Sequence, residues 1–119
     1  MRLYLAGPMT GYPDDNFRAF AEAAEALREK GFEVVAPHEG DLSMDYDPRV
    51  QGPSFANPSF DLATALSRDV EAVLGSDGVA LLPGWQESPG ALVEVLTAEG
   101  AGLPWAPVDS WLEYARLTI

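Results

Sequence analysis

Apolar residues along this chain form short runs that are separated by stretches with a helical period. Residues 2–6 and 32–36 are such runs, closed by Gly-Pro and by a proline, as buried strands leading into loops are. Residues 77–82 are almost continuously apolar, which is typical of a central parallel strand. Residues 103–108 contain two prolines, so a strand there belongs at a sheet edge.

Between these runs, apolar residues recur every three or four positions, which is the spacing of one helix face. Capping residues indicate where three of the helices begin: Ser59, Ser88 followed by Pro89, and Asp109. We therefore expect helices over residues 17–30, 59–74, 88–101 and 109–116. Residues 38–58 are rich in Gly, Pro, Asp and Ser and have no period, which predicts a long mobile loop.

Strands and helices thus alternate, which predicts an α/β fold: a three-layer αβα sandwich with a parallel sheet of four to five strands, of the flavodoxin or Rossmann type. The 119 residues suit one hydrophobic core, so we expect a single domain over residues 1–119. In such folds small molecules bind at the carboxyl ends of the strands. That edge here carries the loops at residues 7–16 and 83–88.

Composition and net charge exclude several classes of partner and several kinds of active site. With 19 acidic and 7 basic residues the net charge is −12, which argues against polymeric nucleic acid or an anionic membrane as a partner. No apolar stretch approaches the ~20 residues of a membrane span and no leader is recognisable, so we expect a cytoplasmic protein. The chain has no cysteine and one histidine, His38, which excludes thiolate catalysis and multi-histidine metal sites. We expect no metal and no cofactor, so carboxylates and backbone dipoles must carry any chemistry.

Glu94 has the strongest chemical signal of any single residue. It lies among apolar neighbours at residues 91–96, on the second turn of a helix that begins at the sheet edge. A partly desolvated carboxylate there can act as a nucleophile, or as an acid with a shifted pKa; the alternative is a solvated helix position. Ser88 and Gly90, at the start of the same helix, could hold an anion such as a phosphate, although an ordinary N-cap also explains Ser88.

Five segments form a recognisable set: residues 4–11 (YLAGPMTG), Arg68-Asp69, Ser76-Asp77, residues 82–85 (LPGW) and residues 88–94 (SPGALVE). Together they resemble the nucleoside 2-deoxyribosyltransferase superfamily, and more closely its small phage and bacterial branch of unknown function, to which deoxynucleoside-monophosphate N-glycosidases are related. The resemblance covers roughly residues 2–104. It implies an enzyme that cleaves the N-glycosidic bond of 2′-deoxynucleotides or deoxynucleosides, by hydrolysis or by transfer.

The resemblance also implies a mechanism and roles for three residues. Glu94 matches the nucleophile, which attacks C1′ with retention and forms a covalent deoxyribosyl intermediate that water or a second base resolves. Asp69 matches the acid that hydrogen-bonds the departing base, and Tyr4 matches a tyrosine whose hydroxyl holds the nucleophile. The alternatives are a solvated helix aspartate for Asp69 and a core-packing tyrosine for Tyr4.

Substrate choice depends on the position that Ser88 occupies. Transferases acting on free nucleosides often have an aspartate there, whereas the monophosphate glycosidases have a serine that takes the 5′-phosphate. The resemblance therefore implies a nucleotide whose phosphate meets Ser88 and the amide of Gly90. Trp85 either stacks on the base or covers a core edge. The expected substrate contacts are Gly7, Pro8, Met9, Trp85, Ser88 and Gly90.

Two other functions stay open at this point: a non-catalytic nucleotide-binding module of phage or bacterial origin, and an interaction protein that keeps only the fold. In the resembled superfamily a neighbouring subunit completes the pocket. This makes a homodimer or higher homo-oligomer the expected assembly, with residues 111–119 as a candidate contact. The acidic residues between positions 39 and 47 lack the spacing of a calcium loop, and we interpret them as a solvated, flexible segment.

Overall fold

The computed structural model describes residues 1–44, 46–52 and 61–118. Its strands are β1 (Arg2–Ala6), β2 (Glu33–Val35), β3 (Gly78–Leu81) and β4 (Trp105–Pro107). Its α-helices are α1 (Phe17–Glu29), α2 (Pro37–Ser43), α3 (Pro48–Gln51), α4 (Leu62–Leu74), α5 (Pro89–Gly100) and α6 (Val108–Thr118). Two 3-10 turns, η1 (Pro13–Asn16) and η3 (Trp85–Glu87), precede α1 and α5.

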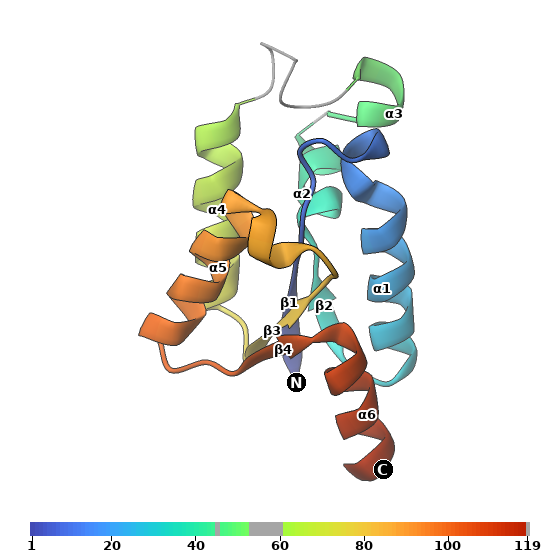
Figure 1. The fold of residues 1–119 in the computed structure, drawn as a ribbon, viewed down its shortest axis with the longest axis vertical. Coiled ribbons are helices and arrows are strands. Elements are labelled where there is room, and N and C mark those ends of the chain that lie inside the picture. Colours follow the sequence, from blue (N-terminus) through green and yellow to red (C-terminus); the bar gives the residue numbers. More distant parts are fainter. Residues whose placement is uncertain (45, 53–60, 119) are drawn as a thin grey trace.

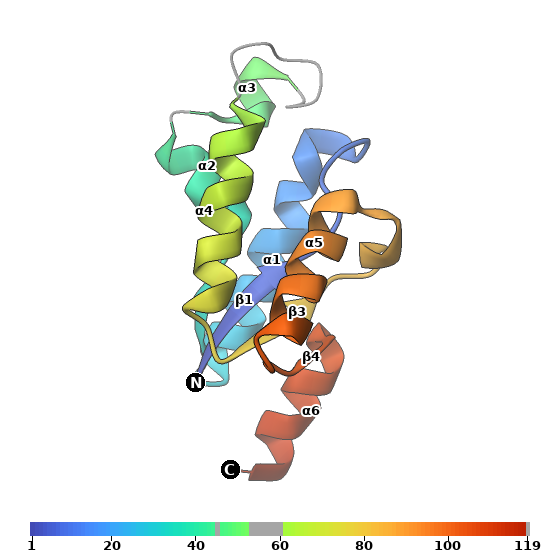
Figure 2. The same cartoon turned by 90° about the vertical axis from the view of Figure 1, so that its left-hand side faces the viewer.

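The four strands form one parallel sheet in the order β2-β1-β3-β4. Helices α1 and α6 cover one face of the sheet, and α4 and α5 cover the other (Figures 1 and 2). The predicted three-layer αβα sandwich is therefore confirmed. Because β1 leads into α1 on one face and β3 leads into α5 on the other, the two connections diverge at the carboxyl ends of the central strands, where such folds have their crevice.

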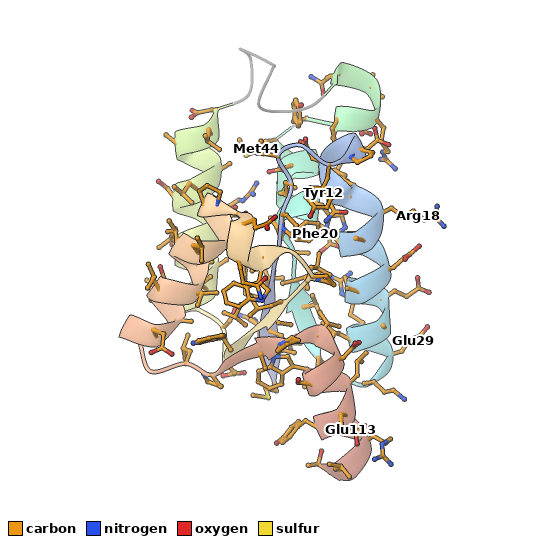
Figure 3. The ribbon with its side chains drawn as sticks, viewed as in Figure 1. Tyr12, Arg18, Phe20, Glu29, Met44 and Glu113 are labelled. Carbon is orange, nitrogen blue, oxygen red and sulfur yellow. The ribbon has the colours of Figure 1, made fainter. Side chains whose placement is uncertain are left out.

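The alternation of side chains along β1 divides the core into two parts. Leu3 and Leu5 pack against α1 and α6, whereas Tyr4 and Ala6 pack against α4 and α5. Along α1 the side chains divide between core and solvent: Phe20 points into the core, and Arg18 and Glu29 point outward (Figure 3). All four of these β1 side chains are fully buried, so the strand that carries Tyr4 is fixed from both sides.

The predicted loop at residues 38–58 is wrong in its described part, which contains α2 and α3. Pro37 occupies the first turn of α2, where its fixed φ suits a helix, and the Asp47 side chain caps α3 by accepting from the amide of Arg49 at 2.9 Å. The proline at the start of α2 and the side-chain cap of α3 thus favour helices in a segment whose composition suggested a loop. Residue 45 and residues 53–58 lie outside the described residues.

Helices α4 and α6 begin at residues other than the predicted ones. Helix α4 is capped by Asp61, whose carboxylate accepts from the amide of Thr64 at 3.0 Å; the predicted cap Ser59 lies outside the described residues. Asp109 lies within the first turn of α6 rather than at its cap, because the helix already begins at Val108. In the described part of the chain, no helix has both the length and the apolar character needed to cross a membrane.

Candidate active site

A cavity of about 550 Å³ opens at the divergence of the β1 and β3 connections. Its walls come from the loop after β1, the segment from Gly84 to the second turn of α5, and the facing sides of α2 and α4. The volume is in the range of small-molecule sites. Both loops predicted to border the binding edge thus contribute to one cavity. Tyr12, from the first of these loops, is one of its lining residues and is labelled in the upper half of Figure 3.

Glu94 lies in this cavity and is only 5% exposed. It is on the second turn of α5, which begins at the cavity because Ser88 caps the helix and Pro89 occupies its first position. Burial, with a smaller contribution from the nearby Asp69 carboxylate, raises the pKa of Glu94 to about 8, although the Tyr4 hydroxyl and Arg68 act in the opposite direction. Near neutral pH the free protein therefore holds a proton on this carboxyl group.

Tyr4 and Asp69 are neighbours of Glu94. The Tyr4 hydroxyl donates to Glu94 Oε2 at 2.8 Å, and its proximity to the Asp69 carboxyl acts to lower the pKa of that group. Burial dominates, however, and raises the pKa of Asp69. The pKa of Tyr4 is raised well above its usual value, by burial first and then by the Glu94 charge, so the phenol keeps its proton.

Arg68 extends this network away from α5. Its Nε and Nη2 donate to Asp69 Oδ1 at 2.9 and 2.7 Å, and Nη2 also donates to Asp41 Oδ1 at 3.0 Å. Its Nη1 lies 3.3 Å from the sulfur of Met44, which is labelled in Figure 3. Gly40 makes this position possible, because a Cβ there would lie 2.5 Å from the Arg68 guanidinium carbon.

Asp41 is a cavity residue that sequence reasoning missed. Its side chain is 4% exposed, it lines the cavity with Asp69 and Glu94, and burial raises its pKa to about 6. The sequence predicts a solvated acidic segment between positions 39 and 47, and the burial of Asp41 contradicts that prediction at this residue. A usable signal was present: Asp41 follows β2, whose carboxyl end lies at the same sheet edge as those of β1 and β3.

Ser88 and Gly90 line the cavity at the start of α5. The Ser88 hydroxyl accepts from the amide of Ala91 at 3.2 Å, which is the N-cap contact. Within the described part of the chain, the amide of Gly90 has no hydrogen-bond partner, and a Cβ at Gly90 would meet no atom within 4 Å. The helix terminus therefore has a free backbone donor at a residue that lines the cavity.

The other predicted contacts divide into two groups. Gly7, Pro8 and Met9 line the cavity. Gly7 must be a glycine, because a Cβ there would lie 2.7 Å from the Cβ of Leu82. Trp85 is not among the lining residues; its ring packs edge-on against Trp105 with centroids 5.6 Å apart, as the alternative of a core-edge cover predicts.

The cavity is acidic. Four carboxylates line it, and no lysine or arginine is among its described lining residues. Asp69 and Asp41 are paired with Arg68, which is not a lining residue of this cavity but lines a second one together with Asp69. Among the residues that the structure describes, no three His, Asp or Glu side chains are arranged to hold a metal ion. His38 lies beside Phe17 in the core, at a centroid distance of 5.5 Å, and is not a lining residue.

Fold and cavity together define the class: an α/β sandwich whose crevice at the diverging strands holds buried carboxylates. Within this class, the chain belongs to the family described as a domain of unknown function (DUF4406), whose model matches residues 1–106. Among solved structures, it is similar to a 2-deoxyribosyltransferase from Bacillus psychrosaccharolyticus, described as a biocatalyst for nucleoside synthesis. That similarity has a TM-score of 0.61 at 18% identity and covers 88% of this chain and 69% of the other. At this identity the similarity shows a shared fold. No curated protein matches the chain significantly.

Proposed function

We propose that this protein is an enzyme that cleaves the N-glycosidic bond of 2′-deoxynucleosides or their 5′-monophosphates. The observation that carries the proposal is the contact of Glu94 with Tyr4 beside Asp69, in a cavity of suitable volume. A buried carboxylate next to an anomeric carbon can act as a nucleophile, and a second carboxyl in a different environment can act as the acid. The shared fold with a 2-deoxyribosyltransferase supports this reaction class.

In the proposed reaction, Glu94 attacks C1′ as its carboxylate and forms an ester to the sugar. The C1′–N bond breaks, its electron pair stays with the base, and Asp69 donates a proton to the base. Water or a second base then attacks C1′ and restores the Glu94 carboxylate, while Asp69 takes the proton from the incoming nucleophile. Tyr4 is a positioning residue that orients Glu94 by its hydrogen bond.

The protonation states of Glu94 and Asp69 set the pH dependence of the proposed reaction. In the free protein Glu94 holds its proton to about pH 8, whereas the reaction needs Glu94 ionised and Asp69 protonated. The Tyr4 hydroxyl contacts both groups, so they titrate as a coupled pair. The reactive form is a minority species, and kcat/KM is expected to follow a bell-shaped pH profile that reports the pair.

The 5′ end of the substrate is proposed to lie at the start of α5. Ser88 and the free amide of Gly90 suit a phosphate or a hydroxyl, and the helix dipole favours an anion. The carboxylate lining disfavours additional negative charge elsewhere in the cavity. Deoxynucleosides and monophosphates are therefore expected to react, and triphosphates to bind more weakly.

The test is release of free base, followed by chromatography, from the common deoxynucleosides and their 5′-monophosphates. Wild-type protein and Glu71→Gln, which removes an exposed carboxylate on α4, should release base, and Glu94→Gln should not. Mass spectrometry should find one deoxyribosyl group on the peptide containing Glu94. No release from any of these substrates, or equal release by Glu94→Gln, would overturn the proposal.

A non-catalytic nucleotide-binding module is the second candidate, and the raised pKa of Glu94 favours it. A protonated carboxyl group is a hydrogen-bond donor to a ligand and a poor nucleophile. This candidate predicts that nucleotides raise the Tm of wild type and of Glu94→Gln alike, without base release from either. Turnover by the wild type excludes it.

Assembly as a homo-oligomer stays a prediction. Helix α6 packs Trp111 and Ala115 into the core of its own chain, so only its outer residues, such as Tyr114 and Leu117, are left for the contact predicted at residues 111–119. Residue 119 lies outside the described residues. Light scattering of the purified protein measures the mass directly, and a monomer would contradict the prediction.

A further inference from the structure

Asp41 is a buried carboxylate in the cavity that the proposed reaction does not use. Its Oδ1 accepts from Arg68 Nη2 at 3.0 Å, which is the same nitrogen that donates to Asp69 at 2.7 Å. Within the described chain, Oδ2 of Asp41 accepts no hydrogen bond. The salt bridge with Arg68 therefore occupies one oxygen of this carboxylate and leaves the other available to accept a hydrogen bond from a ligand.

The hydrogen bonds give Asp41 a definite position relative to the proposed chemistry. Contacts run in order from Glu94 through Tyr4 and Asp69 to Arg68 and then Asp41, from α5 to α2. If C1′ lies at Glu94 and the 5′ end lies at the start of α5, the base extends toward Asp69. The next acceptor in that direction is Asp41.

The surroundings of Asp41 suit the faces of a base. Pro37 of α2 and Leu62, Ala65 and Leu66 of α4 line the same cavity and supply apolar surface. Such walls contact ring faces without choosing among bases, so discrimination falls to polar groups at the ring edge. Asp69 and Asp41 are the carboxylates beside these walls.

From this placement, and resting on the proposed function, we propose that Asp41 selects the base, and that the site prefers bases with an exocyclic amino group over thymine and uracil. An ionised carboxylate only accepts hydrogen bonds. The amino groups of cytosine and adenine donate to it, whereas the O4 carbonyl of thymine or uracil would face it oxygen to oxygen. A buried acceptor left without a donor is strongly disfavoured.

The sharpest test uses two substrates that differ at one ring edge, 5-methyl-2′-deoxycytidine and thymidine. With wild-type protein, kcat/KM for base release should be at least tenfold higher for 5-methyl-2′-deoxycytidine. Asp41→Asn keeps an oxygen for Arg68 and supplies a donor in place of the second oxygen, so the ratio should fall at least tenfold. Glu39→Gln is the matched control: it lies on the same helix, is exposed, pairs with Arg28 at 2.7 Å, and is not in the lining of this cavity.

The outcomes separate the two proposals. Base release from neither substrate, nor from any other deoxynucleoside or deoxynucleoside 5′-monophosphate, overturns the proposed function. Release from both at similar rates by the wild type leaves the function standing and overturns base selection by Asp41. An equal loss on both substrates in Asp41→Asn, with the ratio unchanged, assigns Asp41 to the support of Arg68 alone and also overturns the inference. The wild-type ratio is decisive by itself if the variant does not fold.

Discussion

Replacing Glu94 with glutamine should stabilise the folded protein, and the gain should grow with pH. In the folded state Glu94 keeps its proton to about pH 8, against an ordinary value of 4.5 in the unfolded chain. Between those values the folded state binds more protons than the unfolded state, so the free energy of unfolding falls as pH rises. Glutamine has no proton to lose, so the variant escapes this fall.

The size of the effect follows from the shift. Each pKa unit corresponds to about 1.4 kcal/mol, so the full window is worth about 3–5 kcal/mol. That is a large share of the stability of a small domain, which is on the order of 5–15 kcal/mol. Near pH 5 the two proteins should be almost equally stable, because the amide is close in shape to a protonated carboxyl and its oxygen can accept from the Tyr4 hydroxyl.

Urea denaturation at intervals from pH 5 to pH 9 measures this difference. Glu71→Gln, which removes an exposed carboxylate on α4, is the control and should follow the wild-type pH dependence. The raised pKa of Asp41 adds a similar loss between pH 4 and pH 6, but it is common to all three proteins and cancels in the comparison. A difference between Glu94→Gln and wild type that stays constant with pH would refute the desolvation of Glu94.

Three further predictions concern the walls of the site. Tyr4→Phe removes a hydrogen bond to the ionised form of Glu94, worth about 1.5–3 kcal/mol, so it should raise the pKa of Glu94 and lower kcat/KM near pH 7 about 10- to 100-fold relative to wild type, with the ratio between the two proteins narrowing at higher pH. Gly90→Ala should fold normally but weaken substrate binding, measured by KM, whereas Gly100→Ala on the same helix should leave it unchanged; equal effects would contradict a ligand at the start of α5. Gly7→Ala should lower stability by about 1–3 kcal/mol in thermal melts, because its Cβ would overlap the side chain of Leu82, directly after β3, and an unchanged Tm would contradict that contact.

The hydrophobic pattern was sufficient for most elements because their determinants are local. The first strand was predicted at its observed bounds, and the third was placed to within one residue at each end. The start of α5 followed from Ser88 and Pro89, which act through capping and a fixed φ within one turn. The prediction for residues 38–58 was wrong in the described part, because it rested on composition alone, whereas Pro37 and Asp47 start short helices there.

The site was predictable only in part. The resemblance named Tyr4, Asp69 and Glu94, and the structure brings these three together; their catalytic roles stay predictions. Asp41 was assigned to solvent because acidic residues in a polar segment are usually exposed. Its burial depends on Arg68, which stands 27 residues further along the chain.

The sequence by itself determined the order of strands and helices, the parallel sheet and the edge at which a ligand would bind, because side-chain period and capping are properties of neighbouring residues. The tertiary structure decided which charged groups meet. Tyr4 and Glu94 are separated by 90 positions, and no local pattern encodes a 2.8 Å contact between them. Only the packing of α4 and α5 on one face of the sheet removes water from Glu94 and Asp69 and sets the protonation of this carboxylate pair.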